Sequence, residues 1–160
     1  MGRLDTDSEG LLLLSNDKKL NHALLDPKNK HNRTYLAQVE GVMEKEKIEE
    51  LVKGITIKVD GKDYQTLPCK AESISEPALP ERNPPIRFRK NIPTSWIKII
   101  LHEGKNRQVR KMTAAVGYPT LRLIRESMED VDLGTMQPGD VEELKAEAIY
   151  RRLKIRSGKG

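Results

Sequence analysis

The sequence has few of the residues that would place it among disulfide-bonded, metal-binding or membrane proteins. Because Cys69 is the one cysteine, no disulfide can form within the chain, and we expect a reducing, cytoplasmic location. The three histidines are isolated from one another and Cys69 has no partner at ligand spacing, so we expect no metal site. The leucine run 11–14 is too short to span a membrane and no secretion signal is recognisable, so we expect no membrane association.

Signatures of several catalytic classes are also missing. Ser8 stands in Asp-Ser-Glu-Gly, which is not a nucleophile elbow, so a serine triad is poorly supported. No glycine-rich phosphate loop follows a strand, so we expect no nucleotide or other small-molecule cofactor. The aromatic residues are one Trp, four Tyr and one Phe, so readout of a nucleic-acid sequence by base stacking must be limited.

The charge of the chain is unevenly distributed. Its 29 basic and 24 acidic residues give a net charge of +5. Residues 82–125 contain eleven Lys or Arg and one acid, Glu103, which is a net +10, whereas the rest of the chain carries −5. A basic band on an otherwise acidic protein is typical of a polyphosphate partner, most often a nucleic acid. A solvated basic face without a ligand is the alternative.

Short strands interleaved with helices predict an α+β fold whose mixed, mainly antiparallel sheet is flanked by helices. We expect one domain over residues 1–153, a basic tail over 154–160, and a monomer. Asp60 and Gly61 predict a tight hairpin turn. The expected helices run from a cap at 15–17 to Pro27 and over 44–53, 107–116 and 145–153; the expected strands cover 11–14, 33–41, 55–59, 64–67, 69–75, 96–102, 121–125 and 131–133.

Three carboxylates lie close together near the start of the chain. Asp5, Asp7 and Glu9 precede the four leucines 11–14, which we interpret as a strand covered on both faces and entered from a loop. Carboxylates held beside such a strand have little freedom to move, as a catalytic carboxylate requires. From the pattern alone the three are equivalent, and Asp5 could equally be a turn or capping residue.

The expected helix 107–116 begins with the cations Arg107, Arg110 and Lys111. Cations at a helix N-terminus oppose its dipole, so they predict a nearby anion, either a phosphate or a carboxylate. In the expected strand 33–41, Tyr35 points the same way as the apolar side chains. A carboxylate, an arginine-rich helix start and an inward tyrosine can support nucleophilic or acid–base chemistry on a sugar or base.

Residues 76–93 form a long segment without a recognisable helix or strand. Five prolines stiffen it, so we interpret it as a positioned functional loop, with a flexible linker as the alternative. Its basic residues are Arg82, Arg87, Arg89 and Lys90.

Three ordered motifs cover much of the chain. They are Gly-Arg-Leu-Asp at 2–5 with Ser-Glu-Gly-Leu-Leu-Leu-Leu at 8–14, then Tyr-Leu-Ala-Gln-Val-Glu-Gly at 35–41, then Glu-Gly-Lys-Asn-Arg-Gln-Val-Arg-Lys-Met at 103–112. Together they resemble the RsuA/RluB/RluE/RluF family of pseudouridine synthases. Residues 82–87 with 92–96, and residues 119–125, resemble the RluE branch in particular.

The resemblance implies a pseudouridine synthase-like fold that isomerises a uridine of large-subunit ribosomal RNA without metal or cofactor. Asp5 then matches the family's catalytic aspartate, the nucleophile toward a flipped-out nucleoside, whereas Asp7 and Glu9 do not. Tyr35 matches the tyrosine that lies against the target base, and Arg110 the arginine that pairs with the aspartate. A nucleophilic aspartate must be ionised, and a neighbouring guanidinium favours the ionised form.

The resemblance also implies substrate-binding residues. Arg3 matches an arginine linked to base flipping, and Val109 matches a small apolar residue beside the catalytic arginine. The basic band is suited to contact RNA phosphates. The expected substrate-binding residues are Arg3, Arg82, Arg87, Arg89, Lys90, Lys105, Asn106, Arg107, Val109 and Lys111.

Family members normally carry a segment with an apolar strand before the Gly-Arg-Leu-Asp motif, so we expect this chain to be N-terminally incomplete relative to the family. Two alternatives to the enzyme stay open. One is a non-catalytic RNA-binding fragment that cannot hold Asp5 in place, and the other is a basic protein-interaction module.

Overall fold

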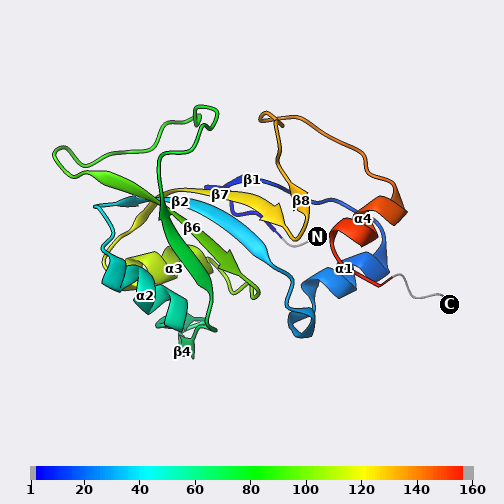
Figure 1. Cartoon of the computed structure of the whole chain (residues 1–160), viewed down its shortest axis with the longest axis horizontal. Helices are drawn as coiled ribbons and strands as arrows, with labels where there is room; N and C mark the ends of the chain where they lie inside the picture. The colour runs from blue at the N-terminus through cyan, green and yellow to red at the C-terminus, as the bar shows by residue number, and fades with distance from the viewer. Residues whose placement is uncertain (1–2, 157–160) are drawn as a thin grey trace.

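The computed structural model describes residues 3–156, which form a six-stranded sheet, a two-stranded hairpin and four α-helices (Figure 1). In spatial order the sheet contains β1 (Glu9–Gly10), β7 (Thr120–Met128), β2 (Arg33–Glu40), β6 (Thr94–Leu101) and β5 (Lys70–Ile74), and β8 (Val131–Asp132) pairs with β7. The pairing of β1 with β7 is parallel and every other pairing in this sheet is antiparallel. The predicted α+β fold with a mixed, mainly antiparallel sheet is confirmed.

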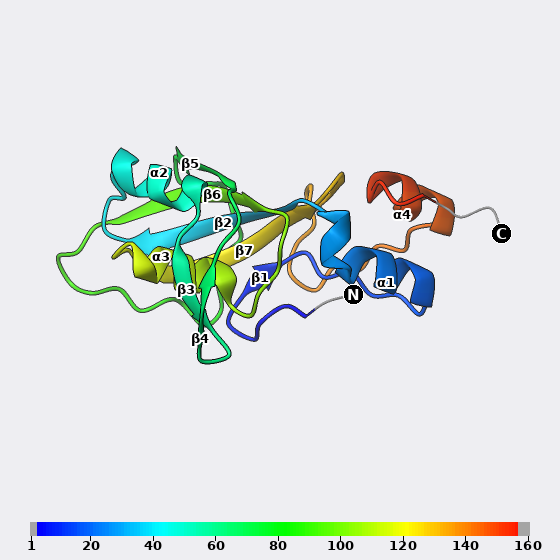
Figure 2. The ribbon, with the colours of Figure 1, turned by 90° about the horizontal axis from the view of Figure 1, so that it is seen from below.

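Helices α2 (Lys45–Lys53) and α3 (Gln108–Ala115) lie on the same side of the sheet (Figure 2). The predicted direction of Tyr35 is confirmed, because Ala37 and Val39 of β2 are buried in the core beneath these helices and Tyr35 packs against that core. Loops cover much of the other face. The smaller cluster buried there consists of Leu36, Trp96 and Ile124.

Helices α1 (Lys18–Leu25) and α4 (Ala146–Arg152) lie together beyond one end of the sheet (Figure 1). The predicted cap of α1 is confirmed, because the Asp17 carboxylate accepts hydrogen bonds from the backbone N–H groups of Lys19 and Leu20. Tyr150 Oη donates to Asp17 Oδ2 at 2.7 Å and lowers the pKa of that carboxyl. One carboxylate therefore caps α1 and connects it to α4.

The leucine run does not form the doubly covered strand that we predicted. Strand β1 covers only the two residues before it, and the leucines alternate between the core and solvent. Leu11 and Leu13 are 6% and 8% exposed, whereas Leu12 and Leu14 are 47% and 82% exposed. The run leaves the sheet edge to enter α1, so only one of its sides meets the rest of the protein.

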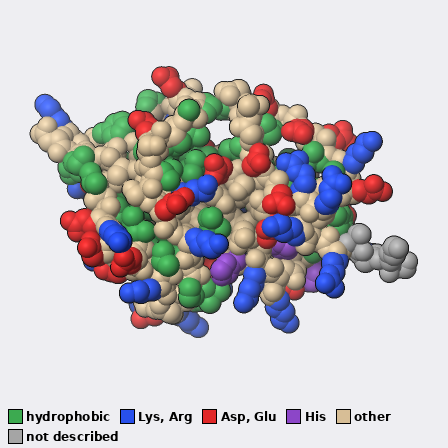
Figure 3. All heavy atoms as spheres, in the orientation of Figure 1, with side chains coloured by type: hydrophobic (Ala, Val, Ile, Leu, Met, Phe, Trp, Pro, Cys, Tyr) green, Lys and Arg blue, Asp and Glu red, His purple; other side chains and the backbone are tan. Residues whose placement is uncertain are grey.

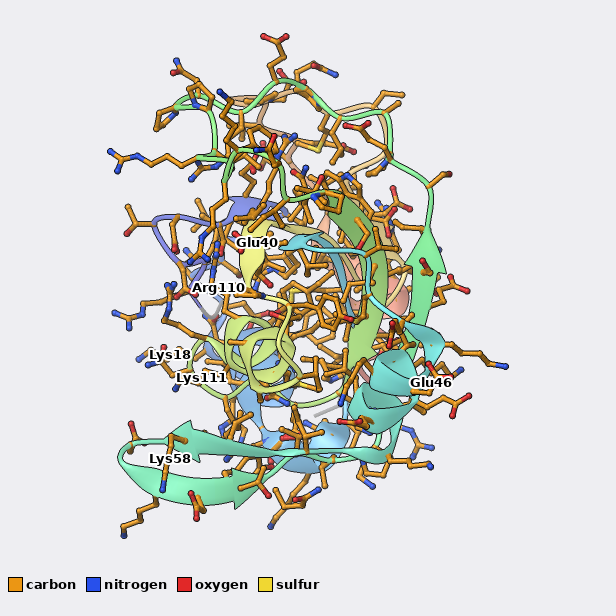
Figure 4. All side chains as sticks on the ribbon, turned by 90° about the vertical axis from the view of Figure 1, so that its left-hand side faces the viewer. Lys18, Glu40, Glu46, Lys58, Arg110 and Lys111 are labelled. Atoms are coloured by element: carbon orange, nitrogen blue, oxygen red, sulfur yellow. The ribbon has the colours of Figure 1, made fainter. Side chains whose placement is uncertain are left out.

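The hairpin predicted across Asp60 and Gly61 is confirmed as β3 (Thr56–Val59) and β4 (Lys62–Gln65), outside the main sheet (Figure 4). The buried carboxylate of Glu103 holds it in place. This carboxylate accepts hydrogen bonds from Tyr64 Oη at 2.5 Å and from the backbone N–H of Leu67 at 2.7 Å. The bond from Tyr64 raises the pKa of the phenol to about 12. Glu103 thereby joins the hairpin to the segment that leads into α3.

The other predicted helices and strands are confirmed with shifted ends, and β7 extends three residues beyond its predicted end. Gly2 of the first motif and residues 157–160 of the expected tail lie outside the described residues. The start of that tail is attached to the domain, because the Ile155 backbone N–H donates to the Tyr150 carbonyl oxygen at 2.9 Å. Across residues 3–156, none of the helices has the length and apolar character needed to cross a membrane.

Candidate active site

The segment that carries the three carboxylates is fixed at one end by the sheet. In the β1–β7 pairing, Glu9 lies opposite Ile124 and Gly10 opposite Arg125. Gly10 has φ +103°, and a Cβ atom there would lie 2.3 Å from the carbonyl oxygen of Arg125. Only glycine permits both this dihedral angle and this close approach. The sheet therefore sets the position of the preceding carboxylates.

Asp7 is held by the arginines at the start of α3. Its carboxylate oxygens accept hydrogen bonds from Arg107 Nη1 at 3.0 Å and Nη2 at 2.9 Å, and Arg110 Nη2 lies 3.6 Å from Oδ2. The Arg107 hydrogen bonds are the main reason that the pKa of Asp7 falls to about 2. The anion predicted near this cationic helix start is therefore a carboxylate, that of Asp7.

Glu9 is held in the same bidentate way by an arginine of β7. Arg122 donates from Nε to Oε2 at 2.8 Å and from Nη2 to Oε1 at 2.9 Å. Arg82 Nε lies 3.5 Å from Oε2 of the same carboxylate. Arg122 Nη2 also donates to the carbonyl oxygen of Pro80 at 2.6 Å. This cluster joins the N-terminal segment, β7 and the first half of the 76–93 loop.

Asp5 is much less engaged. Within residues 3–156 its carboxylate accepts no hydrogen bond, and its one ion pair joins Oδ2 to Arg107 Nη1 at 3.6 Å. The side chain is 34% exposed and lines an open pocket of about 660 Å³. The other residues that line this pocket are Arg3, Leu4, Thr6, Asp7, Arg82, Pro84 and Arg107. Asp5 thus presents carboxylate oxygens with unused lone pairs to a cavity rich in arginine.

Arg110 extends from α3 toward the N-terminal segment (Figure 4). Its Nη2 donates to the carbonyl oxygen of Asp7 at 3.0 Å and lies 3.4 Å from Ser8 Oγ. Among the residues the structure describes, Asp5 forms its ion pair with Arg107 and has none with Arg110. Burial lowers the pKa of Arg110, and the charge of Asp7 opposes that effect. Arg110 therefore holds the backbone of the carboxylate segment, and Arg107 contacts Asp5 itself.

Tyr35 and Val109 do not line the pocket formed by the described residues. Tyr35 is half-buried on β2 and lies opposite Arg125, which in turn lies opposite Gly10. Two strand spacings place its backbone roughly 10 Å from Gly10. Val109 is 3% exposed and belongs to the core beneath the sheet.

The predicted substrate-binding residues other than Val109 fall into two groups. Arg3, Arg82 and Arg107 line the pocket. Lys105 is exposed and its Nζ lies 4.9 Å from the centroid of the Tyr64 ring. Lys105 and the remaining predicted residues lie outside the pocket. Of these, Arg87, Arg89, Lys90 and Asn106 are exposed and Lys111 is half-buried.

Sequence reasoning missed the roles of the two arginines of β7. Arg125 is 4% exposed, and its Nε donates to the carbonyl oxygen of Leu11 at 2.8 Å. Arg122 holds Glu9, as described above. Both arginines stand among apolar residues of a predicted strand, where a buried charge requires a partner. That mismatch was the signal that could have identified them.

The described residues include no group of three or more His, Cys, Asp or Glu side chains placed to hold a metal ion. What the site offers is a carboxylate, several arginines and an open cavity. This arrangement can bind an anionic substrate and attack it with a carboxylate oxygen.

Fold and sequence comparisons agree on the class of protein. Residues 1–115 match the family model for RNA pseudouridylate synthase, so the chain belongs to the RNA pseudouridylate synthase family. A crystal structure of a pseudouridylate synthase superposes with a TM-score of 0.74 at 26% sequence identity, covering 95% of this chain and 57% of that one. The resemblance found in the three sequence motifs is confirmed.

Within this family the chain is similar to proteins that are named ribosomal large subunit pseudouridine synthases. It is 52% identical over 144 residues to ribosomal large subunit pseudouridine synthase E of Vibrio parahaemolyticus, covering 90% of this chain and 59% of that protein. It is 45% identical over 139 residues to the protein of the same name from Xanthomonas campestris, covering 86% and 72%. It is 37% identical over 151 residues to ribosomal large subunit pseudouridine synthase B of Bacillus subtilis, covering 94% and 55%.

Proposed function

We propose that this chain is an isomerase that converts a uridine of large-subunit ribosomal RNA to pseudouridine, with Asp5 as its catalytic residue. Relatives at 45–52% identity are named as large-subunit pseudouridine synthases, and the chain spans 59% of the length of the Vibrio parahaemolyticus relative. The observation that carries the proposal is the contrast among the three carboxylates. The carboxylates of Asp7 and Glu9 are each engaged by a bidentate arginine, whereas the carboxylate of Asp5 accepts no hydrogen bond within residues 3–156 and faces the pocket.

The reaction needs a nucleophile and two proton movements. The bond between N1 of the base and C1′ of the ribose breaks and a bond between C5 and C1′ forms, while C5 loses a proton and N1 gains one. An ionised Asp5 can form a transient covalent bond to the nucleoside and hold it while the base reorients. Arg107 Nη1 lies 3.6 Å from Oδ2 of Asp5 and forms an ion pair with this carboxylate. No atom enters or leaves overall, so the chemistry calls for no external reagent.

The remaining arginines position the catalytic segment and the RNA. Arg110 donates to the Asp7 carbonyl oxygen and fixes the segment on which Asp5 lies. Arg3 and Arg82 line the pocket and are placed to contact phosphates beside the target nucleotide. Extruding a base from a stack costs a few kcal/mol, and the free energy of such contacts has to offset that cost. We assign Tyr35 to the target base, since it lies two strands from Gly10 on the face that carries α3.

The outer basic residues provide the wider RNA surface. We propose phosphate contacts for Arg87, Arg89 and Lys90 on the 76–93 loop. We propose the same contacts for Lys105, Asn106 and Lys111 near the start of α3. Replacing Arg87 and Arg89 by alanine should weaken binding to ribosomal RNA and reduce the slope of log affinity against log salt by about 0.7–0.9 per contact. Filter binding over a salt series measures this slope, and an unchanged slope contradicts the assignment. Since ribosomal RNA is the substrate, we place the activity in the cytoplasm.

The direct test incubates the 160-residue chain with an unmodified transcript of bacterial large-subunit ribosomal RNA and maps pseudouridine chemically. We expect one or a few defined uridines to be converted, and none with the Asp5→Asn variant. RNA binding that depends on salt, without product at any uridine, would instead identify a non-catalytic RNA-binding fragment. Binding to no RNA at all would favour a protein-interaction module.

A further inference from the structure

The 76–93 loop displays the most exposed aromatic side chain of the described chain. Phe88 is 62% exposed, whereas Trp96 is 5% exposed and the four tyrosines are half-buried. A single exposed apolar residue is common on protein surfaces and needs no explanation by itself. The surroundings of Phe88 are what make it informative.

Cations surround Phe88 along the chain. Arg87, Arg89 and Lys90 are all exposed, so the sequence Arg-Phe-Arg-Lys presents an aromatic ring among three positive charges. Ile92, two residues further on, is 38% exposed. In Figure 3, a basic side chain stands at the end of the tip at the upper left, and hydrophobic side chains lie further in, toward the body of the molecule. Aromatic rings interleaved with cations are typical of surfaces that bind single-stranded nucleic acid.

The loop is attached to the domain on both sides of Phe88. On one side Arg82 donates to the carbonyl oxygen of Asp7 at 3.4 Å, and the carbonyl oxygen of Pro80 accepts from Arg122 Nη2 at 2.6 Å. On the other side Arg89 Nε lies 3.5 Å from Glu40 Oε1, at the end of β2. These contacts restrict the movement of the loop on both sides of Phe88, which reduces the entropy lost when a partner binds.

The distance from Phe88 to the pocket can be expressed as a number of nucleotides. Pro84 lines the pocket, and Phe88 follows it by four residues, so the backbone can separate them by at most roughly 14 Å. Stacked nucleotides rise about 3.4 Å each along a strand. Phe88 therefore lies within about four nucleotide rises of Pro84, which lines the same pocket as Asp5.

We propose that Phe88 stacks on a base of the substrate RNA a few nucleotides from the target uridine. This inference rests on the function proposed above. Stacking is available only to an unpaired or splayed base, so Phe88 selects a target whose neighbouring nucleotides are single-stranded. Every base has an aromatic face, so the contact reads the local RNA structure rather than the identity of one base.

The test compares Phe88→Leu, which keeps apolar bulk without an aromatic face, with Phe88→Trp, which keeps the face. Val141→Ala, at a side chain that is 93% exposed on another loop, is the control. We expect Phe88→Leu to weaken binding to the unmodified large-subunit transcript by about 5- to 150-fold. Phe88→Trp and Val141→Ala should bind like the unaltered chain. The salt slope should be the same for all four proteins, because no phosphate contact is removed.

A spectroscopic measurement separates stacking from charge. Trp96 is 5% exposed, so the added indole of Phe88→Trp is the fluorophore that RNA can reach. An oligouridylate should quench it, and an abasic oligomer with the same number of phosphates should not. Equal quenching by both oligomers, or wild-type affinity of Phe88→Leu, overturns the inference.

Pseudouridine yield is measured in the same samples. Phe88-dependent binding without product supports the stacking contact and refutes the proposed activity, so the two failures are distinguishable.

Discussion

Replacing Asp5, Asp7 and Glu9 one at a time by their amides should separate catalysis from stability. Asp5 has one ion pair at 3.6 Å and is 34% exposed, so Asp5→Asn should change the free energy of unfolding by no more than about 0.5 kcal/mol. The amide cannot act as a nucleophilic carboxylate, so pseudouridine formation should be abolished. Affinity for the RNA should be almost unchanged, because no cation that contacts phosphate is lost.

Asp7→Asn should have the opposite effects: it should lower stability and leave part of the catalytic activity. A fall in pKa from 3.8 to about 2 corresponds to about 2.5 kcal/mol between the two protonation states. The Asp7 side chain is 45% exposed, so solvent screening reduces the contribution to about 1 kcal/mol, or a fall in Tm of roughly 2–4 °C. Turnover should fall by no more than about 100-fold, because Arg107 loses its alignment while Asp5 remains.

The pH dependence of this difference follows from the direction of the shift. The folded pKa of Asp7 is depressed, so its contribution is fully present above the unfolded pKa of 3.8 and is lost as pH falls through about 2. The stability gap between the unaltered chain and Asp7→Asn should therefore close between about pH 4 and pH 2.

Glu9→Gln weakens the bidentate pair with Arg122 and should lower the free energy of unfolding by about 1.5 kcal/mol.

Thermal unfolding by circular dichroism and chemical mapping of pseudouridine, run on the same three variants, provide the readout. Full activity of Asp5→Asn would refute the assigned nucleophile. Loss of all activity in Asp7→Asn with an unchanged Tm would transfer the catalytic role to Asp7. Either result would show that freedom from hydrogen bonds does not identify the reactive carboxylate in this cluster.

Three further outcomes are expected. Gly10→Ala should lower Tm strongly and remove activity, because its Cβ would lie 2.3 Å from the Arg125 carbonyl oxygen at a φ of +103°. Tyr64→Phe should cost about 1–3 kcal/mol by removing a donor from buried Glu103, and the pair's contribution in the unaltered chain should be present below pH 10 and lost as pH rises through about 12. Burial raises the pKa of the Cys69 thiol to about 11, so a thiol reagent should label the folded chain far more slowly than the urea-unfolded chain.

Most helices and strands could be predicted because they depend on local patterns. The cap at Asp17 and the turn at Asp60 and Gly61 are set by residues a few positions apart, and both are confirmed. The leucine run 11–14 was misread because apolar character alone does not distinguish a strand covered on both sides from an extended segment at the sheet edge. That distinction depends on which elements pack beside the run.

Part of the candidate site could also be predicted from local patterns, and part depends on tertiary packing. Sequence motifs were enough to select the family and to single out Asp5, Tyr35 and Arg110, and the basic character of the 82–125 segment follows from composition. Those residue roles remain predictions for the experiments above. The position of the cavity was not predictable, because its lining comes from segments that are about 80 and 100 residues apart.

The motifs single out Asp5, but only the folded chain shows that the three carboxylates have different surroundings. Asp5, Asp7 and Glu9 alternate with other residues over five positions and look alike in the sequence. Asp7 is engaged by Arg107 and Arg110, and Glu9 by Arg122, across roughly 100 residues of chain. The Asp5 carboxylate accepts no hydrogen bond from the described residues, because Arg107 directs its hydrogen bonds to Asp7 and forms only a 3.6 Å ion pair with Asp5. Charge neutralisation across such separations depends on tertiary packing, and no local pattern encodes it.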